Sequence, residues 1–400
     1  MRDLLGSRWA FLILLLVGRM AMGFQLQAVG SVTPFLIDEF QVDYAQIGTL
    51  VGLYLLPGIV LALPGGFIGQ ALGDHRTLLV GLAAMAGGCA LVANAGDFDT
   101  AMAGRLVNGA GGVLVTVMGT KMVADRFSGR ILILAVALFG NGFAVGVATG
   151  QVTQVAMADA FGWRMVFWVA AAIAALGFLC AAAYRSPGGS RATGRLRFSF
   201  GLNRQQAMAV TMAGICITLH FGGFVIMVAM APVYLAGKGL APELASALVG
   251  INTWVAMVGM PLGGLLAQRV PPHLLVMIGI PLQGLALAAL PLGLVGYDPL
   301  AVGALFAVVG ICGALPAATL MSLAPTAVPP TLLGVGMGLY WSWFYTGAAL
   351  LPPVAGWAAD VTGDLGMPLL VAAAMSAGVL AGFVCFGRIR RRMPDFPAAA

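Results

Sequence analysis

Long apolar stretches recur along the whole chain, separated by short polar or proline-containing breaks. Each stretch is close to the roughly 20 residues that a helix needs to cross the hydrocarbon core of a bilayer. The pattern predicts an all-α membrane protein with twelve transmembrane helices, over residues 10–33, 45–68, 77–95, 100–122, 131–155, 164–184, 206–231, 244–267, 273–294, 299–322, 332–355 and 367–387. The first stretch follows a basic start as a secretory signal would, but Arg19 interrupts it and hydrophobicity then resumes, so we expect a retained helix.

A short motif occurs twice, at a separation of almost half the chain. It reads "GGFIGQALGDHR" in the first half and "GGLLAQRVPPHL" in the second. Gly66 and Gly264 occupy the same place in the two copies, 198 residues apart (264 − 66). Such a period indicates a duplicated half. We therefore predict two pseudo-symmetric six-helix bundles, a polar linker and a basic tail, over residues 1–185, 206–388, 186–205 and 389–400.

Composition and charge limit the class of protein. Hydrophobic residues make up 60% of the chain and charged residues 8%, against about 25% charged residues in soluble domains, which excludes an ordinary water-soluble surface. With the N-terminus inside, only Arg164 and Lys238 of the 20 basic residues fall in predicted outside segments. This distribution follows the positive-inside rule. It predicts a multi-pass protein of the inner (cytoplasmic) membrane with both termini in the cytoplasm.

The formal net charge of +6 fits this topology and does not call for a nucleic-acid partner. The arginines of the linker and the tail are expected to contact the headgroups of membrane lipids. The five cysteines fall within apolar stretches and show no metal-ligand spacing, so we expect neither a metal site nor a cofactor. Since the chain also lacks a recognisable catalytic constellation, we do not expect an enzyme.

The repeated motif carries a resemblance to a known family. Twelve helices in two related halves, with a glycine-rich turn after the second helix, resemble the major facilitator superfamily of secondary transporters. The turn of that family usually reads G-x-x-x-D-R-x-G-R-[RK]. Here Gln70 stands at the aspartate position, Gln268 repeats this departure, and the charges move to Asp74 and Arg76. The resemblance implies a gating role for these four residues, although a neutral glutamine makes no ion pair.

Further stretches extend the resemblance over nearly the whole chain. "GRLVNGAGG", with Arg105, Gly109 and Gly111, resembles the R-x-x-x-G-x-G pattern of the family's fourth helix. "GRMAMGFQLQAVGSVTPFL" looks like the first helix of the cyanate permease and nitroimidazole-resistance group, which often keeps an arginine there. The resemblance implies alternating access around a midplane site lined by helices one, four, seven and ten, and a monomer.

Two arginines within predicted spans are the main candidates for substrate chemistry. A buried arginine in a membrane costs on the order of 2.5–3.5 kcal/mol by insertion scales, and no Asp or Glu falls within a predicted span to pair with Arg19 or Arg105. The planar guanidinium group binds carboxylates and similar oxyanions. We expect Arg19 to bind the substrate, with a structural bond to carbonyls as the alternative. Arg105 is expected to serve binding, gating or structure, and Lys121 to extend its ammonium group to the membrane surface.

Neutral and aromatic side chains within the spans supply the remaining candidates. His220 is the only histidine in a predicted span, so it could carry a proton or simply bond to a carbonyl. The aromatic residues of the eleventh predicted helix could stack on an organic substrate or pack. The full set of predicted binding residues is Arg19, Gln27, Arg105, Asn108, His220, Asn252, Trp341 and Tyr345.

Two functions remain open on the sequence. The first is a secondary transporter of a small anion, organic or inorganic, coupled to a proton or to an exchanged anion. The alternative is a proton-driven exporter of drugs or other organic compounds. Gln151 stands where the family's exporters often have a proline on the fifth helix, and no span holds a carboxylate, so we favour the anion transporter.

Overall fold

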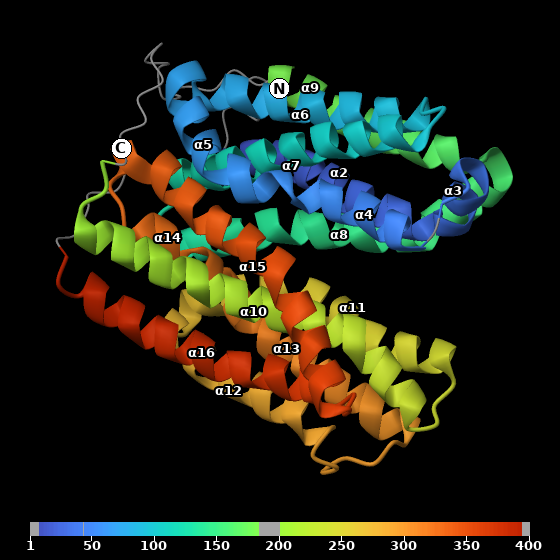
Figure 1. The fold of residues 1–400 in the computed structure, drawn as a ribbon. Coiled ribbons are helices and arrows are strands. Elements are labelled where there is room, and N and C mark those ends of the chain that lie inside the picture. Colours follow the sequence, from blue (N-terminus) through green and yellow to red (C-terminus); the bar gives the residue numbers. More distant parts are fainter. Residues whose placement is uncertain (1–7, 43, 184–200, 394–400) are drawn as a thin grey trace.

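The computed structural model of the chain describes residues 8–42, 44–183 and 201–393, and these contain helices and no strand. Most of the predicted linker over 186–205 and the end of the predicted tail therefore lie outside the described residues. Figure 1 shows the helices in two groups, with the one coloured from blue to green above the one coloured from yellow-green to red. We refer to these groups as the N-terminal and the C-terminal half.

The N-terminal half contains α2 to α9. Their bounds are Arg8–Ser31 for α2, Thr33–Phe40 for α3, Tyr44–Leu55 for α4, Pro57–Leu72 for α5, Asp74–Ala93 for α6, Phe98–Arg126 for α7, Gly129–Phe161 for α8 and Trp163–Ala183 for α9. The break between α4 and α5 falls at Pro57, which has no N–H to donate and which favours the first turn of a helix. One predicted span, 45–68, is therefore two consecutive helices.

The C-terminal half contains α10 to α16. Their bounds are Arg204–Gly237 for α10, Pro242–Arg269 for α11, Pro272–Ala289 for α12, Pro299–Met321 for α13, Leu323–Thr326 for the short α14, Leu333–Thr362 for α15 and Met367–Arg390 for α16, with a 3₁₀ turn over Pro330–Leu332 before α15.

The twelve-helix prediction fits this architecture. Ten helices in the described part of the chain are long and apolar enough to cross a membrane. The consecutive pair α4 and α5, together with α15, supplies the other two spans. Large apolar side chains such as Leu176, Leu179 and Leu285 remain exposed, as expected for surfaces that face lipid rather than water.

The apolar cores place the contact between the halves at one end of the molecule. One core draws residues from both halves, including Met118 of α7 and Trp341 of α15, and a small one joins Ala137 of α8 to Ala267 of α11. Two other cores each belong to one half alone, around Phe24 and around Phe306. The shared cores lie at the end where α8 and α15 begin and α11 ends, which the positive-inside rule predicts to be cytoplasmic.

Two glycines allow the main chains of the halves to approach closely at this end. A Cβ on Gly338 of α15 would lie 2.8 Å from the carbonyl oxygen of Ala62 on α5. A Cβ on Gly264 of α11 would lie 2.9 Å from the Cα of Leu134 on α8. Both distances are too short for a side chain, so the contact requires glycine at these positions.

Candidate functional site

Arg19 lies halfway along α2 and is the centre of the candidate site. Its side chain is buried, and its Nη1 donates to the Oγ1 of Thr116 at 2.6 Å and lies 3.0 Å from the Sδ of Met22. Its Nε has no hydrogen-bond partner among the described residues. Arg19 is thus a buried cation with an unused donor.

Aromatic rings from both halves surround the Arg19 guanidinium. Its Cζ lies 5.3 Å from the ring centroids of both Phe139 and Phe143 on α8. On the opposite half, the Trp341 ring of α15 lies 5.7 Å from the same atom. Such cation–π contacts stabilise a charge that has left water. Because Trp341 belongs to the C-terminal half, the cation is in contact with both halves at once.

The Arg19 charge has no acidic partner in the described part of the chain. The ion pairs found there join Lys121 to Asp74 and Asp125, and Arg164 to Glu39. A buried cation without an anion is costly. An anionic ligand that reached Arg19 would therefore pair with the guanidinium charge and accept a hydrogen bond from the free Nε.

The aromatic residues predicted on the eleventh span complete the site. Trp341 packs edge-on against Phe344, with ring centroids 5.0 Å apart, and Tyr345 lies 6.3 Å from Trp341. The Tyr345 ring covers Gly58 of α5, where a Cβ would meet it at 2.2 Å. The structure therefore brings Arg19, Trp341 and Tyr345 together, as three of the eight predicted binding residues.

Arg105 lies in a different environment, entirely within the N-terminal half. Its Nε donates to the carbonyl of Leu50 at 3.1 Å and its Nη1 to the carbonyl of Gln25 at 2.9 Å. Its guanidinium also lies 4.6 Å from the ring centroid of Tyr54. These contacts join α7 to α2 and α4, so they support a structural role, while the Nη2 of Arg105 has no partner among the described residues. Its roles in binding and gating stay predictions.

The four other predicted binding residues make no described contact with Arg19. Asn108 donates to the Sγ of Cys89 at 2.9 Å, and Gln27 donates to the Oγ of Ser31 at 3.3 Å. Asn252 packs on Gly310 of α13. His220 is partly buried on α10. Their role in binding therefore stays a prediction, and Asn108 faces α6 rather than the aromatic cluster around Arg19.

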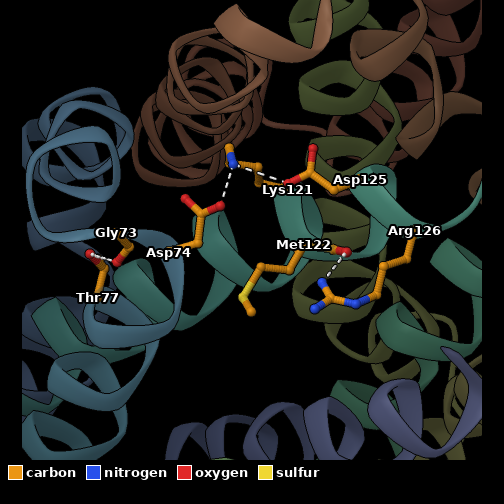
Figure 2. Close-up of polar contacts among 7 residues, drawn as sticks. All are labelled: Gly73, Asp74, Thr77, Lys121, Met122, Asp125 and Arg126. Carbon is orange, nitrogen blue, oxygen red and sulfur yellow. Dashed lines mark hydrogen bonds and ion pairs between the residues drawn. The ribbon is translucent and has the colours of Figure 1, made fainter. Parts of the chain in front are cut away.

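A buried ionic cluster lies at the predicted cytoplasmic end of the N-terminal half, where the gating residues were predicted (Figure 2). The Nζ of Lys121 bonds to the Oδ2 of Asp74 and, at 3.0 Å, to the Oδ2 of Asp125. Lys121 and Asp74 are both buried. The expected extension of Lys121 to the membrane surface is thus wrong. The helices extend beyond the predicted spans and include these acids, because α6 begins at Asp74 and α7 includes Asp125.

The other gating candidates lie apart from this cluster. The main-chain carbonyl of Gln268 accepts a 2.8 Å hydrogen bond from the Nη1 of Arg130, which links the end of α11 to the start of α8 across the two halves. Arg76 is exposed. Gln70 is part of α5, but its side chain lies outside the described residues.

Three residues of the site were missed on the sequence, namely Thr116, Phe139 and Phe143. Phe139 and Phe143 are four residues apart, so a helix places them on one face. Their spacing is a signal that could have found them, although it does not say which helix they meet.

Comparison with known proteins gives the family. The model of the Major Facilitator Superfamily matches residues 15–352. Among curated relatives, the Lincomycin resistance protein of Streptomyces lincolnensis is 28% identical over 169 residues, which is 41% of this chain and 34% of that protein. The Tetracenomycin C resistance and export protein of Streptomyces glaucescens is 23% identical over 164 residues, 41% of this chain and 30% of that protein. The chain thus spans about a third of the length of these relatives.

Solved structures agree on the fold. A structure of the Major Facilitator Superfamily transporter FucP in the outward conformation has a TM-score of 0.77 at 16% identity, covering 97% of this chain and 99% of that one. At this identity the likeness concerns the fold alone.

Proposed function

The chain belongs to the Major Facilitator Superfamily, and from this premise we propose that it is a secondary transporter of a small anion. The two bundles, 1–185 and 206–388, would rock about a site at Arg19 so that the site opens to one side of the membrane at a time. The family is one of transporters, and we propose no enzymatic activity.

One observation carries the proposal. Arg19 is a buried cation halfway along α2, it has a free Nε, and it has no acidic partner in the described part of the chain. Arg105 also has one buried nitrogen without a partner, Nη2, but main-chain carbonyls accept hydrogen bonds from its other two nitrogens. Arg19 differs because its described hydrogen bonds go to the side chains of Thr116 and Met22 and to no main-chain carbonyl.

The membrane potential constrains the coupling. An interior-negative potential opposes entry of a monoanion by about 2.3 kcal/mol per 100 mV. Import therefore requires a co-transported proton or an exchanged anion, whereas export requires neither. His220 is our candidate for a proton carrier during import.

We further propose that the structure corresponds to the state closed toward the cytoplasm. Support comes from the shared cores and from the Arg130–Gln268 contact, which lie at the end predicted to be cytoplasmic. In this view Gln268 acts in gating through its carbonyl group and Asp74 through the Lys121 cluster, with Gln70 and Arg76 as further gating candidates. We expect a monomer in the inner membrane, with both termini cytoplasmic and contacting lipid headgroups.

Ligand-induced thermal stabilisation of the purified protein tests the proposal. A panel of small anions and organic cations is measured on the unchanged protein, on Arg19→Gln, and on Arg388→Gln, which removes an exposed arginine near the end of α16. We expect one class of anion to stabilise the unchanged protein and Arg388→Gln, but not Arg19→Gln. Equal stabilisation of all three proteins would disprove binding at Arg19.

The second candidate is an exporter of organic compounds. The names of the two Streptomyces relatives, which concern antibiotic resistance and export, favour it. In this case hydrophobic or cationic compounds would stabilise the protein, and Arg19→Gln would leave that stabilisation unchanged.

A further inference from the structure

We infer that the indole N–H of Trp341 is the second donor to the transported anion, and that this anion is an organic monocarboxylate with an aromatic or similarly apolar body. The inference rests on the proposed function, since it assumes that Arg19 binds an anion. It adds the donor from the other half of the protein and the chemical class of the substrate.

Two buried donors in the aromatic cluster have no acceptor. They are the Nε of Arg19 and the Nε1 of Trp341, neither of which has a hydrogen-bond partner among the described residues. Buried N–H groups in proteins are nearly always hydrogen-bonded. Two unused donors on neighbouring side chains therefore point to an acceptor that binds between them.

The two side chains that carry these donors are neighbours. The guanidinium carbon of Arg19 lies 5.7 Å from the Trp341 ring centroid. A carboxylate has two oxygens, each with free lone pairs, so it can accept from a guanidinium through one and from an indole N–H through the other. A chloride-like ion offers no such pair of separated acceptors.

The walls of the site indicate what the carboxylate is attached to. The rings of Phe139 and Phe143 lie near the Arg19 guanidinium, and those of Phe344 and Tyr345 lie near the Trp341 ring. Aromatic rings favour stacking with a flat apolar group. The described contacts of Arg19 include no carboxylate that could pair with an ammonium group. Amines and zwitterionic amino acids are therefore disfavoured.

The placement of the donors couples binding to the conformational cycle. Arg19 belongs to α2 of the N-terminal half and Trp341 to α15 of the C-terminal half. A carboxylate bound to both can do so only while the halves are together at this end. Binding of the carboxylate must therefore shift the equilibrium toward the state in which the halves are together. The size of the shift is set by the ratio of the carboxylate's affinities for this state and for the state in which the two donors are apart.

The test measures binding of benzoate, acetate and benzylamine to the full-length protein by calorimetry. Trp341→Phe keeps an aromatic ring but removes the N–H together with part of the indole. Trp343→Phe makes the same loss of size on the same helix, where the indole packs on Gly214 of α10 instead. We expect Trp341→Phe to weaken benzoate binding by about tenfold or more, as for loss of one hydrogen bond to a charged group, and Trp343→Phe to leave it unchanged. Acetate should bind more weakly than benzoate, and benzylamine should not compete.

The outcomes separate this inference from the proposed function. If Arg19→Gln abolishes benzoate binding while Trp341→Phe behaves as Trp343→Phe does, the second donor is refuted and anion binding at Arg19 stands. If Arg19→Gln has no effect on benzoate, or if no anion of the panel binds, the proposed function itself is refuted. Acetate binding as tight as benzoate binding, or competition by benzylamine, would overturn the assigned substrate class. Should Trp341→Phe fail to fold, Trp341→Met replaces it, because methionine also fills the space without an N–H.

Discussion

Removal of the Lys121 ammonium group is expected to destabilise the N-terminal half strongly. In Lys121→Met the long apolar stem is kept, but two carboxylates remain together without a cation. The Asp74 side chain is 5% exposed and cannot gain much water, whereas Asp125 is 26% exposed and can. Removing one partner of a buried ion pair costs about 3–5 kcal/mol. Because Asp125 is partly hydrated, we expect a loss near the lower end, about 3 kcal/mol.

Reversible unfolding in mixed detergent micelles measures this loss. Lys238→Met is the matched control, since Lys238 is exposed and has no ion pair among the described residues. Adding Asp74→Asn to Lys121→Met should recover part of the loss, because it removes the carboxylate that became unpaired. If Lys121→Met is as stable as Lys238→Met, or if the effects of the two changes at the cluster simply add, the account of the ionic cluster is wrong.

Three further changes test other parts of the structure. Arg105→Gln removes two hydrogen bonds from a charged donor to main-chain carbonyls, so the free energy of unfolding in micelles should fall by about 3 kcal/mol. Arg105→Lys should show a similar fall. Gly338→Leu inserts a side chain where α15 meets α5, and hydrogen–deuterium exchange should show faster exchange in both helices; unchanged exchange would contradict the contact. The hydrogen bond from Arg164 lowers the pKa of Glu39 in the folded protein. The pair therefore stabilises the fold at pH values above the carboxyl pKa of the unfolded protein, and this contribution is lost as the pH falls through the lower pKa of the folded protein. Thermal unfolding should therefore show that Glu39→Gln lowers the free energy of unfolding by less than about 1 kcal/mol near pH 7, since the pair is exposed. Below the pKa of Glu39 in the folded protein, the same change should have no effect.

The number of helices and the burial of Arg19 without an acidic partner in the described part of the chain could be predicted, because both depend on local sequence. A span needs only a sufficient run of apolar residues. An intramembrane arginine without a nearby acid is unusual wherever it lies. The aromatic cluster was only partly predictable, because the packing of α8 against α2 decides that Phe139 and Phe143 meet Arg19. A rotation of either helix by one residue would turn them away.

Partners that are distant in the sequence account for the predictions that failed or stayed open. Lys121 was expected to have no acidic partner, because Asp74 lies 47 residues earlier and was expected in a cytoplasmic turn rather than at the buried start of a helix. Asn108 looked suited to the substrate path, yet it bonds to Cys89 on the neighbouring α6. A hydropathy pattern shows that a residue is in the membrane, but it does not show which neighbour the residue faces.

The repeated motif shows which part of the ionic cluster the fold requires. α6 begins at Asp74 and α12 begins at Pro272, so the two helix starts are separated by the offset of the motif, 198 residues (272 − 74). The same offset takes Lys121 to Thr319 (319 − 121). The equivalent place in the C-terminal half is therefore uncharged, with a proline at the first position of the helix. Since α12 forms without any such ion pair, the helix start itself does not need Asp74. The charges are therefore present at only one of the two corresponding helix starts. Loss of Lys121 should consequently act through the uncompensated carboxylates. Neutralising Asp74 as well should recover part of the stability, because the corresponding helix start in the other half is uncharged and only Asp125 then remains without a cation.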